Sequence, residues 1–137
     1  MRVKGRYCRG RGEAAAFTRL EWVQEQCREK LGFNPRPGTV NLRVKAGDLA
    51  RLRQVAEARG VVLASPCREY CDAFCLPARL GRAGTFVEGA LVFPRVGDYY
   101  TDMIEFLCPV EVKSRFELQE EEEMELIIIR PDANAGD

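Results

Sequence analysis

The sequence predicts a mainly β domain, a closed barrel that carries helical insertions. Segments rich in β-branched and aromatic residues recur along the chain, only two stretches show the period of a helix, and turn residues separate the segments. A length of 137 residues with 46% hydrophobic residues suits one domain with one core. We therefore expect a single domain over residues 1–131 and a disordered tail over residues 132–137.

The N-terminal part is predicted to hold one strand and one helix. Arg2 to Arg9 form the strand, which ends at the glycine-containing loop Gly10 to Gly12. Thr18 opens the helix, because a hydroxyl three residues before Glu21 forms a capping box, and Gly32 ends it in a left-handed conformation. The residues at helical spacing that form its apolar face are Leu20, Val23, Cys27 and Leu31.

The middle of the chain is predicted to form a loop, a strand and a second helix. Asn34 to Gly38 contains two prolines and cannot continue a helix. The strand Thr39 to Val44 alternates, so that Thr39 and Asn41 face opposite to its apolar residues. The second helix spans Asp48 to Arg59. Its inward residues and its stop are Leu49, Leu52, Ala56 and Gly60.

The rest of the chain is predicted to be strands joined by turns. The β-rich segments are Val61 to Ala64, Tyr70 to Leu76, Phe86 to Phe93, Ile104 to Cys108 and Met124 to Ile129. The acidic run Glu120 to Glu123 predicts a solvated turn before the last of these strands.

The sequence shows no targeting or membrane-spanning pattern. No apolar stretch approaches the roughly 18 to 20 residues that span a bilayer. The basic start, Met1 to Gly12, is not followed by the apolar region of a signal peptide. We expect a cytoplasmic protein with no membrane partner, and a monomer.

Charge is divided unevenly along the chain, although the formal net charge is zero. Residues 1–60 hold 14 Lys and Arg against 6 Asp and Glu, a balance of +8, and residues 61–137 hold 7 against 15, a balance of −8. Either the basic half attracts an anionic ligand such as a nucleotide, or the two halves attract each other within one fold. Nucleic acid is a less favoured partner, because no known reader motif accompanies the basic residues.

The six cysteines come without any histidine. Histidine-based catalytic triads and histidine-ligated zinc sites are therefore excluded. Cys67, Cys71 and Cys75 are four residues apart, which is neither a redox pair nor a usual zinc or iron–sulfur spacing. We interpret them as small buried hydrophobic residues rather than as ligands of a metal.

Two segments in the first third carry residues suited to phosphate chemistry. The glycines of GRGEAAAF, Gly10 to Phe17, let a backbone approach a phosphate; the alternative is a loop that needs glycine torsions. The segment PGTVNL, Pro37 to Leu42, places the oxygens of Thr39 and Asn41 on one face, which suits a hydrated magnesium ion. The alternative is a turn whose polar side chains cap backbone groups.

A third segment, Gly97 to Lys113, carries an acidic residue within an apolar strand. Glu105 lies between two apolar residues and faces opposite to them, so it is either solvated or lines a ligand cleft. Tyr99 and Tyr100 either stack on a planar ring or are ordinary surface aromatics.

Taken together, these segments resemble the CTP-dependent riboflavin kinases over about residues 5–129. LGFNPRPGTVNLRV, Leu31 to Val44, is similar to the family signature LGFxPxPGTLNL. GALVFPR, Gly89 to Arg95, and MIEFLCPVEVKSRFEL, Met103 to Leu118, follow in the family's order.

The resemblance implies a six-stranded cradle-loop barrel and a set of site residues. It implies a magnesium ion on Thr39 and Asn41, and a flavin-contacting glutamate at Glu105. The nucleotide-binding positions that it implies are Arg11, Gly12, Glu13, Ala14, Ala15, Ala16, Val110, Glu111, Val112 and Lys113. The flavin-contacting threonine of the family falls on Gly97, with Thr101 nearby. The chain also departs from the family at Ala14, where a glycine is usual, and at Lys113, where an arginine is usual.

The resemblance further implies that the protein phosphorylates riboflavin to FMN and converts CTP to CDP. Glu105 then either orients the riboflavin hydroxyl or accepts its proton. The alternatives are a barrel that binds flavin or nucleotide without turnover, as a carrier or sensor, and a protein whose basic half contacts nucleic acid.

Overall fold

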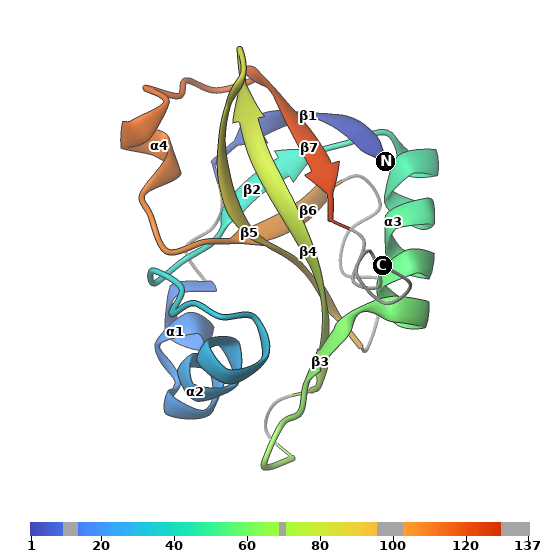
Figure 1. Ribbon diagram of the computed structural model, residues 1–137, viewed down its shortest axis with the longest axis vertical. Coiled ribbons are helices and arrows are strands. Elements are labelled where there is room, and N and C mark those ends of the chain that lie inside the picture. Colours follow the sequence, from blue (N-terminus) through green and yellow to red (C-terminus); the bar gives the residue numbers. More distant parts are fainter. Residues whose placement is uncertain (10–13, 69–70, 96–102, 130–137) are drawn as a thin grey trace, which may run out of the picture.

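The computed structural model describes residues 1–9, 14–68, 71–95 and 103–129, with only the backbone described at residues 14–16. It is mainly β, as predicted, with helices inserted between the strands (Figure 1). The strands are β1 (Arg2–Cys8), β2 (Val40–Arg43), β3 (Val61–Leu63), β4 (Ala73–Arg82), β5 (Thr85–Pro94), β6 (Met103–Leu107) and β7 (Glu123–Ile128). The helices are α1 (Ala14–Arg19), α2 (Glu21–Lys30), α3 (Ala46–Arg59) and α4 (Val112–Arg115). None of the helices in these ranges is long and apolar enough to cross a membrane.

The strands form one antiparallel sheet in the order β3-β4-β5-β6-β2-β1-β7. Strand β7 pairs with β1 on one side and with β4 on the other. The pairing therefore returns to β4, so that β4, β5, β6, β2, β1 and β7 each pair with two others of these six, and β4 also pairs with β3. We refer to these strands as the strand ring.

Strand β4 is longer than the sequence predicted. It pairs with β3 through Ala73 to Cys75 and with β7 through Ala78 to Gly81, and it continues past the predicted end at Leu76 to Arg82. Pro77 lies between the two stretches and accepts a hydrogen bond from the backbone N–H of Ile129 through its carbonyl oxygen. A proline is tolerated at a position where the ladder requires no N–H donor.

The main core is built from every strand of the ring. Side chains at alternate positions form one buried cluster that includes Val3, Leu42, Leu76, Leu80, Leu91, Phe106 and Leu126. Helix α3 adds Leu49, Leu52 and Ala56, the residues that the sequence predicted to face inward. The α3 prediction is confirmed, with the helix beginning two residues earlier, at Ala46.

A second, smaller core lies on the opposite face of the sheet. Cys75, Ala90 and Leu107 each neighbour a main-core residue in sequence, so they face the other way. They pack with Val23 and Cys27 of α2. Helices α1 and α2 therefore cover a different part of the sheet from α3 (Figure 1).

Two predictions for the N-terminal helical region are wrong. The capping box is absent: α2 begins at Glu21 after Leu20, which makes no side-chain cap, and Thr18 lies in α1. The segment Ala14 to Phe17, predicted as loop, belongs to α1, because alanine has the highest helix propensity. The predicted stop at Gly32 is confirmed, with a φ of 84° and an N–H that donates to the carbonyl of Cys27 at 3.0 Å.

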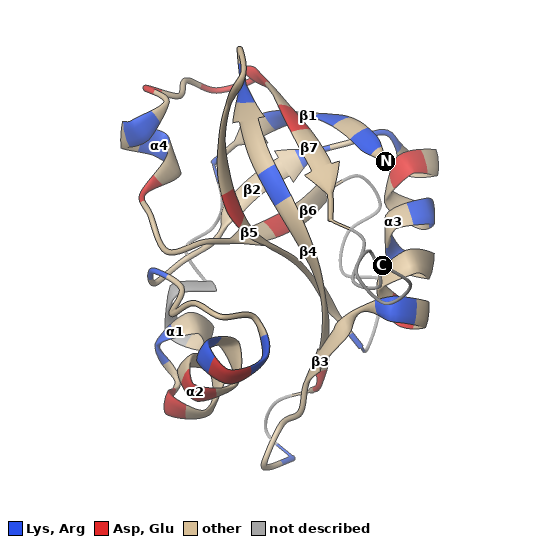
Figure 2. Cartoon of the chain, viewed as in Figure 1, with Lys and Arg blue, Asp and Glu red and all other residues tan. Residues whose placement is uncertain are grey.

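Ion pairs join the basic and acidic halves of the chain. Basic residues on β1 lie beside acidic residues on β7 (Figure 2). The pairs between the halves include Arg2–Glu125, Lys4–Glu123, Arg36–Glu111 and Arg43–Glu121. These contacts support the interpretation that the halves attract each other, although each exposed pair contributes little stability alone.

The cysteines divide into exposed and buried thiols. Cys67 and Cys71 are exposed, so their interpretation as buried hydrophobic residues is wrong, whereas Cys75 is fully buried. Burial raises the pKa of the Cys75 thiol, and it raises the pKa of Cys27 to about 11. Within the described residues, no group of three His, Cys, Asp or Glu side chains could hold a metal ion.

A native thiol titration should therefore show two classes of cysteine. With a disulfide reagent at pH 8, Cys67 and Cys71 should react within minutes, while Cys8, Cys27, Cys75 and Cys108 react only on unfolding. At a pKa of about 11, only about one Cys27 thiol in a thousand is ionised at pH 8. Mass spectrometry of the labelled peptides identifies the sites, and fast labelling of Cys75 would contradict the described packing.

Candidate functional site

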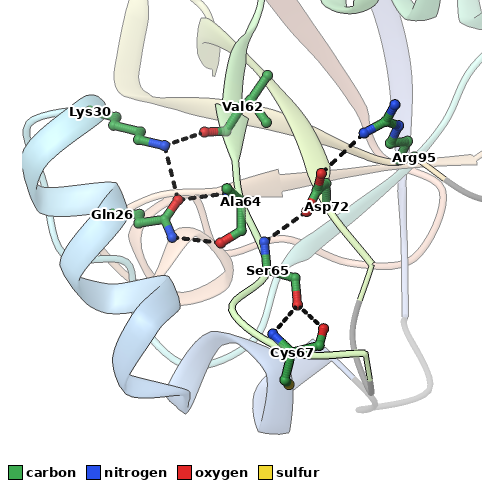
Figure 3. Close-up of polar contacts among 8 residues, drawn as sticks. All are labelled: Gln26, Lys30, Val62, Ala64, Ser65, Cys67, Asp72 and Arg95. Atoms are coloured by element: carbon green, nitrogen blue, oxygen red, sulfur yellow. Dashed lines mark hydrogen bonds and ion pairs between the residues drawn. The ribbon is translucent and has the colours of Figure 1, made fainter.

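Helix α2 is fixed against the sheet by polar side chains at the edge of β3 (Figure 3). The amide of Gln26 donates to the carbonyl of Ala64 and accepts from its N–H, both at 2.7 Å. Lys30 donates to the carbonyl of Val62 at 2.7 Å and to Gln26 at 3.0 Å. Because β3 pairs only with β4 in the described sheet, these bonds satisfy edge groups that a further strand would otherwise pair.

The loop after α2, residues 34–38, is here called the proline loop, and side chains of the helical region hold its first side. Thr18 is fully buried, and its hydroxyl accepts a hydrogen bond of 2.7 Å from the backbone N–H of Gly38. The amide of Gln24 donates to the carbonyls of Thr18 and Pro35, at 2.6 and 2.9 Å. Asn34 in turn donates to Gln24.

The second side of the proline loop is bound to the segment that follows β6. The backbone N–H of Arg36 donates to the carbonyl of Cys108 at 2.9 Å. The guanidinium of Arg36 lies 3.5 Å from the carboxylate of Glu111, measured from Nη2 to Oε2. The loop is therefore held from both sides immediately before Thr39 and β2.

A cleft of about 220 Å³ opens between the proline loop and the segment after β6. We call it the proline-loop cleft. It brings Thr39 together with four of the predicted nucleotide-binding positions, Val110 to Lys113, which lie about seventy positions further along the sequence. The residues that line it are Tyr7, Arg36, Pro37, Gly38, Thr39, Val40, Phe106, Cys108, Val110, Glu111, Val112 and Lys113.

The hydroxyl of Thr39 is left free by the described residues to bind a ligand from outside the chain. Its Oγ1 atom is buried and has no hydrogen-bond partner among the described residues. Asn41, two residues further on and within β2, is only 7% exposed. Neutral oxygen donors of this kind match the ligand preference of magnesium, so the residues present fit the predicted metal.

Asn41 and Glu105 are direct cross-strand neighbours in the β2–β6 ladder. Paired residues project to the same face of a sheet, so this carboxylate lies on the same face as Asn41. Glu105 is half-buried between the buried Ile104 and Phe106, which confirms that it faces opposite to them. Neither Asn41 nor Glu105 lines the proline-loop cleft; Glu105 borders a small hollow beside Arg53 of α3.

The proline-loop cleft carries charges of both signs. Arg36 and Lys113 contribute positive charge, and Glu111 contributes a carboxylate that also accepts a hydrogen bond of 2.9 Å from Ser114. Burial, and then the charge of Glu120, raises the pKa of the Tyr7 hydroxyl, which keeps it protonated as a donor. The cleft therefore offers cationic and neutral donors to an anionic ligand.

Several predicted site residues cannot be placed in this geometry. Arg11, Gly12, Glu13, Gly97 and Thr101 lie outside the described residues, as do Tyr99 and Tyr100. For Ala14, Ala15 and Ala16, the structure shows the backbone of the first turns of α1.

Among the cleft residues that were not predicted as site residues, Tyr7 and Arg36 bring a hydroxyl and a charge. Tyr7 was interpreted only as part of a strand, and Arg36 only as part of a loop. Arg36 had a recognisable signal, because an arginine between two prolines and just before a candidate metal ligand has a restricted backbone. Tyr7 had none, since its place in the cleft depends on the pairing of β1 with β2.

Comparison with known proteins gives a family match over most of the chain. The model of the CTP-dependent riboflavin kinase domain, also described as domain of unknown function DUF120, matches residues 7–128. The chain is similar to riboflavin kinases of three archaea. It is 30% identical to that of Archaeoglobus fulgidus over 132 residues, 30% identical to that of Ignicoccus hospitalis over 129, and 32% identical to that of Methanothermobacter thermautotrophicus over 119.

These alignments cover nearly all of this chain and different shares of the relatives. They include 94, 92 and 87% of this chain, and 55, 70 and 92% of the three relatives in the same order. The chain thus spans little more than half of the Archaeoglobus protein and nearly all of the Methanothermobacter protein.

Replacing Thr18 tests the anchor of the proline loop. In Thr18→Val the N–H of Gly38 loses its acceptor while the side-chain volume is kept, so the free energy of unfolding should fall by about 1–3 kcal/mol. Urea denaturation measures the loss, and amide exchange should show a faster Gly38 N–H. The matched control, Thr85→Val at the exposed start of β5, should stay within about 0.5 kcal/mol of the unaltered chain. An unchanged Gly38 exchange rate would show that the hydroxyl does not hold the loop.

Proposed function

This chain belongs to the CTP-dependent riboflavin kinase family, and from that membership we propose that it transfers a phosphoryl group from CTP to riboflavin. The observation that carries the proposal is the proline-loop cleft, which joins Thr39 to the segment Val110 to Lys113. The reaction breaks the bond between the γ-phosphorus and the bridging oxygen of CTP. It forms a bond from that phosphorus to the 5′-oxygen of riboflavin, whose proton is released, and it yields CDP and FMN.

The strand ring supports the six-stranded cradle-loop barrel that the family resemblance implies. Six strands with two paired neighbours each leave no open edge within the ring, which is how a barrel avoids unpaired edges. The insertion that carries α1, α2 and the proline loop then contributes Arg36, Pro37 and Gly38 to the cleft.

Thr39 and Asn41 would hold the magnesium ion of this reaction. The buried Oγ1 of Thr39 has no partner among the described residues, and the largely buried Asn41, two residues further on, would supply an amide oxygen. Held by these two residues, such an ion would supply charge neutralisation for the phosphates. What the chain itself contributes is a rigid pair of oxygens, since the proline loop is held on both sides.

The nucleotide is proposed to bind between two segments of the chain. Val110 to Lys113 border the cleft, and Lys113 brings an ammonium group to the phosphates. Arg11 to Ala16 would lie along the nucleotide by the family resemblance, and α1 begins within that segment at Ala14.

Glu105 is proposed to meet the acceptor side of the site. It lies beside Asn41 in the ladder, so a hydroxyl that it orients, or whose proton it accepts, is close to the metal ligands. Phosphoryl transfer depends mainly on positioning and charge neutralisation, which suits a chain without histidine. Gly97 and Thr101 remain proposals for flavin contact from the family resemblance.

Incubation with nucleotides tests the activity directly. The chain is mixed with riboflavin, magnesium and one of CTP, ATP, GTP or UTP, and FMN is measured by chromatography. We expect FMN with CTP, and little with the other three. Saturable binding of CTP or riboflavin without any FMN would instead select a carrier or sensor, and no binding of either would contradict both functions.

Replacing Thr39 tests the metal site through two opposed effects. Thr39→Val removes a buried oxygen that has no partner among the described residues, so the free energy of unfolding should stay constant or rise by roughly 1 kcal/mol. The same change should lower magnesium-dependent FMN formation at least about tenfold, as a lost metal contact does.

The control, Thr39→Ser, keeps the hydroxyl and should keep most of the magnesium-dependent activity. Thermal denaturation and a magnesium titration of the initial rate measure the two effects. Full activity at low magnesium in Thr39→Val would remove Thr39 from the metal site, and the same result in Asn41→Leu would remove Asn41.

A further inference from the structure

Arg36 lies in the proline-loop cleft on a backbone that the fold restrains. It stands between Pro35 and Pro37, and its N–H donates to the carbonyl of Cys108 at 2.9 Å. This bond joins the proline loop to the segment after β6 through the backbone, so it persists whatever side chain occupies position 36, proline excepted. The Cα atom of Arg36 is thus placed at the border of the cleft before any ligand binds.

The guanidinium of Arg36 is held loosely. Its nearest acidic partner, Glu111, lies 3.5 Å away, whereas a charge-assisted hydrogen bond measures about 2.7–2.9 Å. The side chains of Arg36 and Glu111 are 55% and 50% exposed, and ion pairs that exposed contribute little to stability. Among the described residues, the Arg36 side chain makes no other hydrogen bond or ion pair, and Cys108 is the one further group on which its charge acts. Most of its five N–H donors therefore remain available to a ligand.

The position of Arg36 relative to the other cleft residues indicates which ligand it suits. Thr39, the proposed metal contact, and Lys113, a compact point charge, border the same cleft of about 220 Å³. A planar guanidinium adds two parallel donors that match two oxygens of a phosphate, which an ammonium cannot do. Glu111 lies in the same cleft, so its contact with Arg36 directs the guanidinium into the cleft when no ligand is bound.

We propose that Arg36 binds the phosphates of the nucleoside triphosphate and leaves Glu111 to do so. This inference rests on the proposed function, because it takes the proline-loop cleft as the nucleotide site. It assigns to the proline loop a direct role in recognising the phosphate chain, in addition to its role in placing Thr39. Neither the base of the nucleotide nor the flavin takes part in this contact.

Binding measurements on the intact chain test the proposal without relying on turnover. Isothermal titration calorimetry in magnesium compares CTP, inorganic tripolyphosphate and cytidine on the unaltered chain and on Arg36→Ala. We expect the variant to bind CTP and tripolyphosphate about tenfold to a hundredfold more weakly, the loss typical of a hydrogen bond to a charged group. Cytidine binding should be unchanged. Arg36→Lys keeps the charge without the two parallel donors and should fall in between.

The matched control is Arg79→Ala. Arg79 is 50% exposed and pairs with Glu88 at 3.2 Å on the β4–β5 hairpin, far from the cleft in sequence and absent from its lining. This variant should bind all three probes as the unaltered chain does. Its circular dichroism and melting temperature, with those of Arg36→Ala, establish that both variants fold.

The outcomes separate the inference from the proposed function. If the unaltered chain binds CTP and Arg36→Ala binds it equally well, the inference is wrong and the proposed function stands. If Arg36→Ala loses cytidine binding together with CTP binding, Arg36 shapes the cleft instead of contacting phosphate, and the inference is again wrong. If the unaltered chain binds neither CTP nor tripolyphosphate, both the inference and the proposed function are wrong.

Discussion

The site depends on one constraint, the attachment of the proline loop from both sides. On one side the buried hydroxyl of Thr18 holds the N–H of Gly38, and on the other the carbonyl of Cys108 holds the N–H of Arg36. Prolines at two of the loop's five positions remove backbone donors and limit φ, so few such bonds suffice. Because β2 begins immediately afterwards, this attachment sets where the side chain of Thr39 lies relative to Val110 to Lys113.

Strand β2 serves packing and chemistry through its alternation. Leu42 is fully buried in the main core, while the neighbouring Asn41 faces the other side and pairs across the ladder with Glu105. The same alternation in β6 buries Phe106 and turns Glu105 outward. The packing of the core therefore also fixes which side Asn41 and Glu105 face. A shift of register by one residue would bury these polar side chains and expose the core.

Docking of α2 on the sheet extends this rigidity to the insertion. Gln26 and Lys30 bond to the edge of β3, and Gln24, on the same helix, bonds to the proline loop. Because α2 is bonded both to the edge of β3 and to the proline loop, the position of the loop is fixed relative to the sheet. Preorganised groups are what phosphoryl transfer requires from a protein, since their alignment need not be established anew in each cycle.

The sequence alone predicted the parts of the fold that depend on local periodicity. The faces of α2 and α3, the stop at Gly32 and the alternation of β2 and β6 are confirmed, because each follows from side-chain spacing along one segment. Thr39 was a candidate from its spacing to Asn41 and from the family resemblance, and Val110 to Lys113 from the resemblance alone; that they border one cleft was decided by the tertiary structure. The predicted capping box was wrong because the Thr18 hydroxyl bonds instead to Gly38, twenty positions away. The predicted end of β4 was wrong because its ladder with β5 continues past Pro77 to Arg82, and β7, distant in sequence, pairs with part of the same stretch. The place of Arg36 and Tyr7 in the cleft was likewise decided by the tertiary structure, since a contact between distant segments leaves no period in either of them.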